Sequence, residues 1–225
     1  MSDDKLTNAF PPPLPSQQEI DAFVDAAGKG DLLAVNAFLS RRPGAIEAQN
    51  SRNDGETALN NAAREGQKAM VEMLLGKGAQ VDGRSKANWS PLITAASCGR
   101  TEVIALLLEK GAEMEAVAQE GWTALMWAAR FGHADTVRFL LEKGANLGAV
   151  NIRGKTVPEL ADNSETIELI EQWPEIIRQR AELEHKTKER EIAEALAREL
   201  DARRLEKLKN HRPPNPPFKG KKPGP

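Results

Sequence analysis

Residues 120–133 read EGWTALMWAARFGH, and this stretch decides the fold because it recurs at a fixed spacing. The segment 33 residues earlier reads ANWSPLITAASCGR, and the one 33 residues before that reads DGETALNNAAREGQ. A weaker copy, RGKTVPELADNSET, follows at 153–166. A period of this length predicts a solenoid, in which no unit buries its own apolar face and adjacent units share one core.

Each unit contains the signals of two short helices joined by a tight turn. Thr57, Ser90 and Thr123 precede apolar runs, where a hydroxyl can accept from the free N–H groups of a helix start. An Ala pair then lets neighbouring helices approach closely. Glycines suit the left-handed turn between the helices and the end of the second helix. These glycines are Gly66, Gly99 and Gly132 in the turn, and Gly78, Gly111 and Gly144 at the end.

This pattern resembles the ankyrin repeat. The resemblance is carried by G-x-T-A-L at Gly55–Leu59 and Gly121–Leu125, by SPL at Ser90–Leu92, and by the AA-x-x-G that follows each. Asn88 stands where a hairpin Gly is usual, but Asn also tolerates the left-handed region. The resemblance implies an all-α fold, an ankyrin-repeat α-solenoid of helix–turn–helix units with β-hairpin loops, here followed by a long charged C-terminal helix.

Composition divides the chain into four expected parts. These are a disordered Pro-rich tail at 1–16, an ankyrin domain at 17–173, a charged helix at 174–210, and a disordered basic Pro-rich tail at 211–225. Within the domain we expect a degenerate repeat at 17–52, repeats at 53–85, 86–118 and 119–151, and a truncated capping repeat at 152–173. Pro158 and the missing Ala pair mark the last unit as atypical.

The expected C-terminal helix differs from the repeats in charge. Residues 1–173 carry 17 Lys/Arg against 24 Asp/Glu, whereas residues 174–225 carry 14 against 9. Pairs such as Glu194–Arg198 and Glu199–Arg203 place an acid four residues before a base, which supports a helix. The apolar spacing does not follow a strict heptad. A coiled-coil dimer, a free solvated helix and a helix folded over the repeats all stay open.

The resemblance places candidate contact residues on the concave side of the stack. Residues after the hairpin glycine lie near the hairpin tip, and residues at the end of the first helix face the groove. The protein-binding candidates are Trp89, Trp122 and Phe131, flanked by Arg130, Arg64 and Glu56. Exposed aromatics beside arginine are typical of binding hot spots. Trp127 and Met126 are expected to point into the interface between helices.

Other functional classes find little support in the sequence. The chain lacks phosphate-loop, zinc-protease, paired-cysteine and serine-hydrolase motifs, and Cys98 has no partner histidine nearby. We therefore expect no enzyme activity, catalytic residue, cofactor or metal. The small net charge of −2 does not favour nucleic acid, and the longest apolar run is too short to span a membrane.

The expected protein is a cytoplasmic module that binds a protein partner through the groove and hairpin tips, as a monomer or a weak dimer through the C-terminal helix. The alternative is an oligomerisation module or an autoinhibited scaffold, in which that helix dimerises or covers the groove. The partner, the organism and export as an effector are not decided by the sequence.

Overall fold

The computed structural model describes residues 14–52 and 55–210, except for the side chains of residues 209 and 210. Residues 1–13 of the tail predicted at 1–16, and the whole tail predicted at 211–225, lie outside the described residues. Ser16, which was assigned to the first tail, is the N-cap of the first helix. Within the described part, the regular structure is helical, and the only bridge of β type joins Val150 and Thr156. The chain forms two compact units that divide between Glu171 and Gln172.

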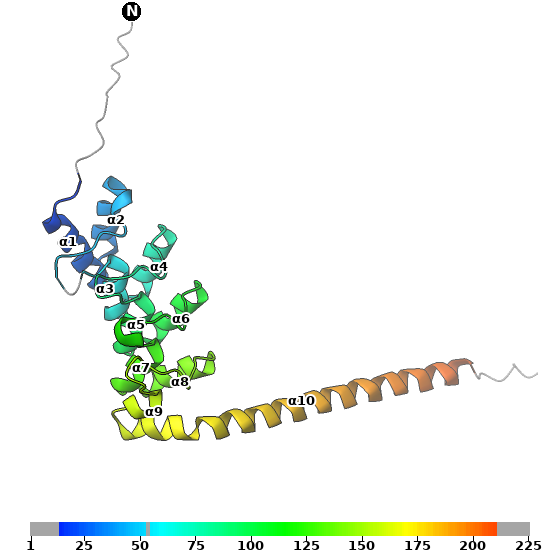
Figure 1. Ribbon diagram of the computed structural model, residues 1–225. Helices are drawn as coiled ribbons and strands as arrows, with labels where there is room; N and C mark the ends of the chain where they lie inside the picture. Colours follow the sequence, from blue (N-terminus) through cyan, green and yellow to red (C-terminus); the bar gives the residue numbers. More distant parts are fainter. Residues whose placement is uncertain (1–13, 53–54, 211–225) are drawn as a thin grey trace, which may run out of the picture. The chain divides into compact units, whose positions relative to one another are not determined.

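The first unit is a stack of helix pairs (Figure 1). Alternate helices α1, α3, α5, α7 and α9 pack on one another in a row, while α2, α4, α6 and α8 each pack against their own partner. The helices are α1 (Gln17–Gly28), α2 (Leu32–Arg41), α3 (Ala58–Glu65), α4 (Lys68–Gly76), α5 (Pro91–Ser97), α6 (Thr101–Glu109), α7 (Ala124–Arg130), α8 (Ala134–Glu142) and α9 (Val157–Leu160). Two short 3₁₀ turns, η1 (Pro43–Ala45) and η2 (Gln119–Gly121), lie in connecting loops.

We call the helices that pack on one another in a row, α1, α3, α5, α7 and α9, the inner helices. The predicted caps are confirmed at the starts of α3, α5 and α7. The hydroxyls of Thr57, Ser90 and Thr123 accept hydrogen bonds from the main-chain N–H groups of Asn60, Ile93 and Met126, at 3.2–3.3 Å. These bonds satisfy donors that a helix start leaves free. Thr156 and Glu159 form a capping box at α9. One hydroxyl in each repeat therefore fixes where the inner helix of that repeat begins.

The turn after each inner helix takes the left-handed conformation expected of glycine. Gly66, Gly99 and Gly132 have φ angles of 77°, 66° and 69°. Asn88 also takes a positive φ, 62°, as its place in the hairpin predicts. Glu120 was not expected there, yet its φ is 59°. Its carboxylate bonds the guanidinium of Arg153 at 2.7 Å, so the strained residue is tied to the next hairpin.

Burial follows the repeat. The Ala pairs at 62–63, 95–96 and 128–129 are fully enclosed between neighbouring inner helices. Leu92, Ile93, Leu107, Met126 and Leu140 expose none of their surface. Because α3, α5 and α7 each pack against the corresponding helices of the repeats before and after, the core is continuous along the stack.

Side chains from three successive repeats also bind the end of the preceding inner helix. Arg100 Nε donates to the carbonyl of Arg64 at 2.8 Å, and Asn163 Nδ2 donates to the carbonyl of Gly132 at 2.9 Å. Between them, His133 Nε2 lies 3.0 Å from the carbonyl of Ser97, so this nitrogen carries the proton. Three different residue types thus satisfy carbonyls that helix ends leave free.

The charged helix begins earlier than predicted. Helix α10 runs from Ser164 to Asn210 and carries Pro174 in its interior, so the expected start at residue 174 is wrong. A proline removes one main-chain hydrogen bond and crowds the carbonyl four residues earlier, but the long run of helix-forming residues after Pro174 continues the helix. Asn163 caps the true start, because its Oδ1 accepts from the N–H of Thr166 at 2.7 Å.

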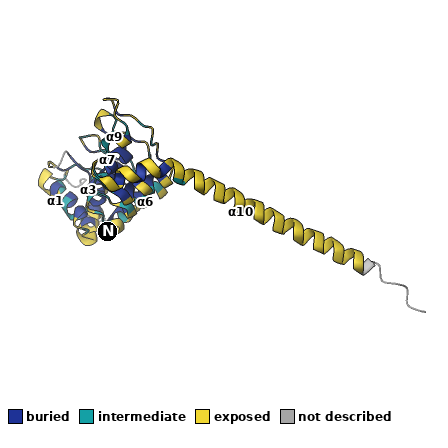
Figure 2. Cartoon of the chain, turned by 90° about the horizontal axis from the view of Figure 1, so that it is seen from below, coloured by how far each residue is buried: buried dark blue, intermediate teal, exposed yellow. Residues whose placement is uncertain are grey.

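Within the second unit, every described side chain from Ile177 to Leu208 is exposed (Figure 2). Ion pairs three or four residues apart, such as Arg190–Glu194 and Arg203–Glu199, decorate its surface. At 1.5 Å per residue this exposed length is about 48 Å. No helix in the described residues is long and apolar enough to cross a membrane.

Candidate functional site

Four hairpins place the candidate residues at corresponding positions along the stack. Each hairpin is closed by a main-chain hydrogen bond to the residue that follows its glycine or Asn88. The bonded pairs are Asn50 with Glu56, Ser85 with Trp89, Ala118 with Trp122, and Asn151 with Lys155. Glu56, Trp89, Trp122 and Lys155 therefore form one row, in which the chemistry changes from acidic through aromatic to basic.

Two tryptophans of this row belong to a cluster of four rings. We define the aromatic cluster as Trp89, Trp122, Trp127 and Phe131. The ring of Trp127 lies at its centre, with centroids 4.7 Å from Trp89, 4.5 Å from Trp122 and 5.7 Å from Phe131. The last pair is nearly parallel, at 13°. Such distances are typical of favourable aromatic pairs.

Trp127 differs from its expected place between the helices. It is half-buried and joins the cluster, whereas Met126 is fully buried as predicted. The indole N–H of Trp127 is enclosed, with no acceptor among the described residues. The corresponding positions in the two preceding units, Asn61 and Thr94, carry polar side chains. The polar residues at the corresponding positions of the earlier repeats could have indicated that this position does not belong to the apolar core.

Phe131 is the outermost member of the cluster. It follows α7 directly and exposes 54% of its surface, while the three tryptophans are half-buried. Arg130 precedes it and pairs with Asp162 at 3.2 Å, with both side chains largely in solvent. An exposed pair of this kind contributes little to folding. Arg130 is therefore accessible beside Phe131, as expected of a flanking residue.

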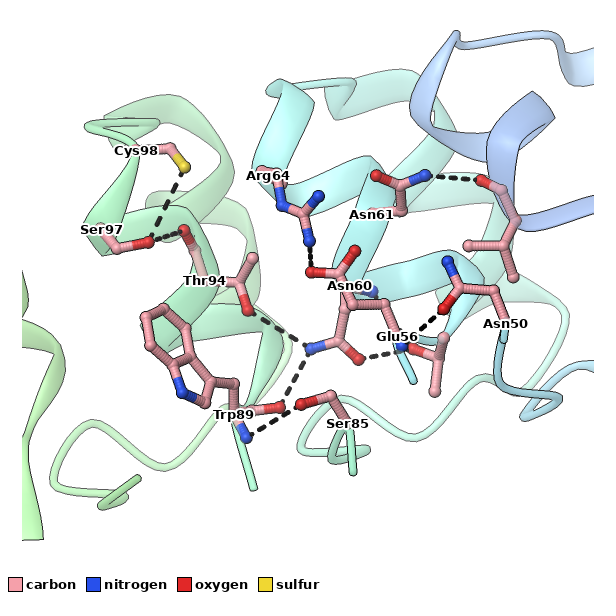
Figure 3. A network of polar contacts seen from close by, with 12 residues as sticks. Asn50, Glu56, Asn60, Asn61, Arg64, Ser85, Trp89, Thr94, Ser97 and Cys98 are labelled. Atoms are coloured by element: carbon pink, nitrogen blue, oxygen red, sulfur yellow. Dashed lines mark hydrogen bonds and ion pairs between the residues drawn. The ribbon is translucent and has the colours of Figure 1, made fainter. Parts of the chain in front are cut away.

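Glu56 and Arg64 lie in a different environment from the one predicted. Glu56 exposes only 6% of its surface, so it is not an open contact residue at the margin. Its carboxylate is ion-paired with the guanidinium of Arg64, which is partly exposed (Figure 3). The main-chain N–H of Glu56 donates to Asn50 Oδ1 at 3.0 Å. These contacts hold the buried acid in place at the base of the first hairpin.

A polar network continues from this pair toward the aromatic cluster (Figure 3). Asn60 Nδ2 donates to the carbonyl of Trp89 at 3.1 Å, and its Oδ1 accepts from the hydroxyl of Thr57 at 2.7 Å. Ser85 Oγ accepts from the N–H of Trp89 at 3.2 Å. The network fixes the main chain that carries Trp89. Sequence reasoning gave no functional role to Asn60 or Ser85, because their contacts depend on how neighbouring repeats and hairpins fold together.

Cys98 and His133 each contact a neighbouring group. The Sγ of Cys98 lies 3.7 Å from the hydroxyl of Ser97, and the Nε2 of His133 is bonded to a main-chain carbonyl. No group of three or more acidic, histidine or cysteine side chains there has the geometry to hold a metal ion.

Comparison with known proteins agrees with this architecture. The family described as "Ankyrin repeats (3 copies)" matches residues 23–118 and 83–151, which together cover more than half of the chain. No curated protein matches the sequence. The matched span contains helices α2 to α8, three of the four hairpins and the aromatic cluster. The chain therefore belongs to the ankyrin repeat family.

Proposed function

We propose that this protein binds a protein partner through the aromatic cluster and the hairpins beside it. Ankyrin repeats are generally protein–protein interaction modules, and the family is typically non-enzymatic. The observation that carries the proposal is the position of Phe131. Its ring stacks on Trp127 yet remains more than half exposed. An aromatic surface with arginine at its edge is the usual composition of an interface hot spot.

The rigidity of the surface supports the same proposal. The rings stand on capped helices and closed hairpins, and each ring touches another ring. A surface that is ordered before binding loses little conformational freedom on association. Trp122 and Trp89 supply the area next to Phe131, and Arg130 supplies a charged edge.

The test compares Phe131→Ala with Leu33→Ala in affinity capture from native lysate, followed by a binding titration with the captured protein. Leu33 is 84% exposed. It belongs to α2, which is not one of the inner helices and lies far from the aromatic cluster in the sequence. We expect Phe131→Ala to weaken binding by at least tenfold, about 1.4 kcal/mol. Leu33→Ala should bind as the wild type does. Equal affinities for both variants would remove the aromatic cluster from the interface.

A second candidate function, self-association through α10, is favoured by one observation. Six large aliphatic side chains on this helix are 55–66% exposed, namely Leu183, Ile192, Leu196, Leu200, Leu205 and Leu208. Light scattering with size exclusion measures the mass directly over a range of protein concentrations. A dimer that is lost in Leu196→Glu would support this function, and a monomer at all concentrations would reject it.

A further inference from the structure

A small polar pocket lies between the first two regular repeats, next to the aromatic cluster. Its volume is about 210 Å³, and its lining residues are Glu56, Arg64, Ser85, Ala87, Trp89, Thr94 and Ser97. Trp89 belongs both to this polar pocket and to the aromatic cluster. A partner that contacts Trp89 in the aromatic cluster therefore lies next to the polar pocket.

The charged pair in the polar pocket is incompletely satisfied. One carboxylate oxygen of Glu56 contacts Arg64, but Oε2 is enclosed and has no hydrogen-bond partner among the described residues. A buried acceptor without a donor is unfavourable. The guanidinium of Arg64 offers five N–H donors in total, and among residues 14–52 and 55–210 the acceptor shown for its side chain is Glu56. Glu56 and Arg64 both line the polar pocket, and this pair still has an unused acceptor and unused donors.

The hydroxyls of the polar pocket differ in what they can still offer. Ser97 Oγ donates to the carbonyl of Thr94 at 2.8 Å, and Thr94 Oγ1 donates to the carbonyl of Ser90 at 3.0 Å. Ser85 is 6% exposed and its oxygen accepts from the N–H of Trp89. The hydroxyl proton of Ser85 has no acceptor shown among the described residues, so it can serve an incoming oxygen.

We propose that the polar pocket binds a primary carboxamide, the side chain of an Asn or Gln of the partner, which rests on the proposed function above. The amide oxygen accepts from Arg64 or from the hydroxyl of Ser85. The amide N–H donates to Glu56 Oε2 when the carboxylate turns toward the polar pocket. The methylene carbons of the ligand then pack against the ring of Trp89.

The polar pocket should bind a neutral carboxamide in preference to a charged carboxylate or ammonium group. A carboxylate would bring a second negative charge against buried Glu56, and it has no donor for Oε2. An ammonium group would bring a second positive charge against Arg64, and it has no acceptor for the guanidinium. A carboxamide carries both a donor and an acceptor and leaves the Glu56–Arg64 pair neutral.

Three small probes of matched size test the proposal on the full chain: propionamide, propionate and propylammonium. Two-dimensional ¹H–¹⁵N NMR follows the indole N–H of Trp89, assigned with a Trp89→Phe variant. We expect propionamide to shift this signal saturably, and each ion to bind at least tenfold more weakly, about 1.4 kcal/mol. Absence of a saturable shift with propionamide, or equal or tighter binding of either ion, would overturn the proposal.

Two substitutions sharpen the result. Glu56→Gln keeps the shape but replaces the acceptor, and should weaken propionamide binding about tenfold. Glu120→Gln removes an acid from an exposed hairpin pair and should leave it unchanged. If Glu56→Gln does not fold, the three probes on the wild type still decide. Phe131→Ala should lose the partner and keep propionamide, so failure of this inference and failure of the proposed function are distinguishable.

Discussion

The stack and the exposed part of α10 are both helical, yet different interactions hold them. In the stack, helices of only four to twelve residues persist because each buries its apolar side chains against the units on either side. In α10, the residues from Ile177 to Leu208 have no covered face and rely on contacts within one or two turns. Helices of the length found in the stack are marginal alone in water. Packing between repeats therefore stabilises the stack, whereas contacts between residues close in sequence stabilise the exposed helix.

The largest expected effect comes from removing equal side chains from the two regions. Leu107 is fully buried in α6, and Leu196 is 55% exposed in α10. Leu107→Ala should lower the free energy of unfolding by about 2–5 kcal/mol, because it leaves a cavity between repeats. Leu196→Ala should stay within about 0.5 kcal/mol. Urea denaturation followed by tryptophan fluorescence measures both, and similar losses would mean that α10 is packed as the repeats are.

A glycine in the stack tests whether its turns require special backbone geometry. A Cβ at Gly132 would lie 2.4 Å from Nδ2 of Asn163, on a backbone with φ of 69°. Gly132→Ala should therefore cost about 1–3 kcal/mol in unfolding free energy. Gly76 lies in α4, where a Cβ would meet nothing within 4 Å, so Gly76→Ala should stabilise by about 0.4–1 kcal/mol. Thermal unfolding that shows the two changes with the same sign would contradict this assignment.

Acid should weaken the first helix pair at one carboxylate. Hydrogen bonds from the hydroxyl of Ser51, the side chain of Gln17 and the N–H of Ser51 lower the pKa of Asp21 to about 2. Because the folded-state pKa is depressed, its stabilising contribution is present above about pH 4 and is lost as pH falls toward 2. Asp21→Asn should lower the melting temperature by a few degrees at pH 7, and the difference should shrink toward pH 2.

A second variant on the same helix is the control for this pH dependence. Asp25 forms only an exposed pair with Arg52 at 3.3 Å, so Asp25→Asn should change the melting temperature less at pH 7. A pH-independent difference between wild type and Asp21→Asn would show that the carboxylate charge is not what holds Ser51.

The smallest effect is expected in the exposed helix. Glu199 and Arg203 form one ion pair across a single turn, at 2.7 Å. Glu199→Gln should cost a few tenths of a kcal/mol of local helix stability at low salt. Amide hydrogen exchange around this turn should accelerate slightly, and the difference should vanish in concentrated salt. A change that spreads into the stack would show that the two units unfold together.

The extent of prediction from sequence follows the same division between local and long-range effects. The caps, the left-handed glycines and the helix pairs were predictable, because each depends on residues within one repeat. The central place of Trp127 depends on Trp89 in the preceding repeat, and the burial of Glu56 depends on how Arg64 folds back over it. The change in composition placed the start of the charged helix at residue 174, but the residues before Pro174 already belong to the same helix.

The side chains of Arg100, His133 and Asn163 have one more consequence. Each donates to a carbonyl in the preceding unit, so these bonds between repeats all run in the same chemical direction, from C-terminal neighbour to N-terminal neighbour. Because a guanidinium, an imidazole and an amide each form this bond, the contact depends on a hydrogen-bond donor rather than on one residue type. A unit could then be duplicated or lost in descent with its junctions still satisfied, provided that a terminal unit supplies the last donor. The length of such a stack is open to change, whereas its C-terminal end must still supply a donor.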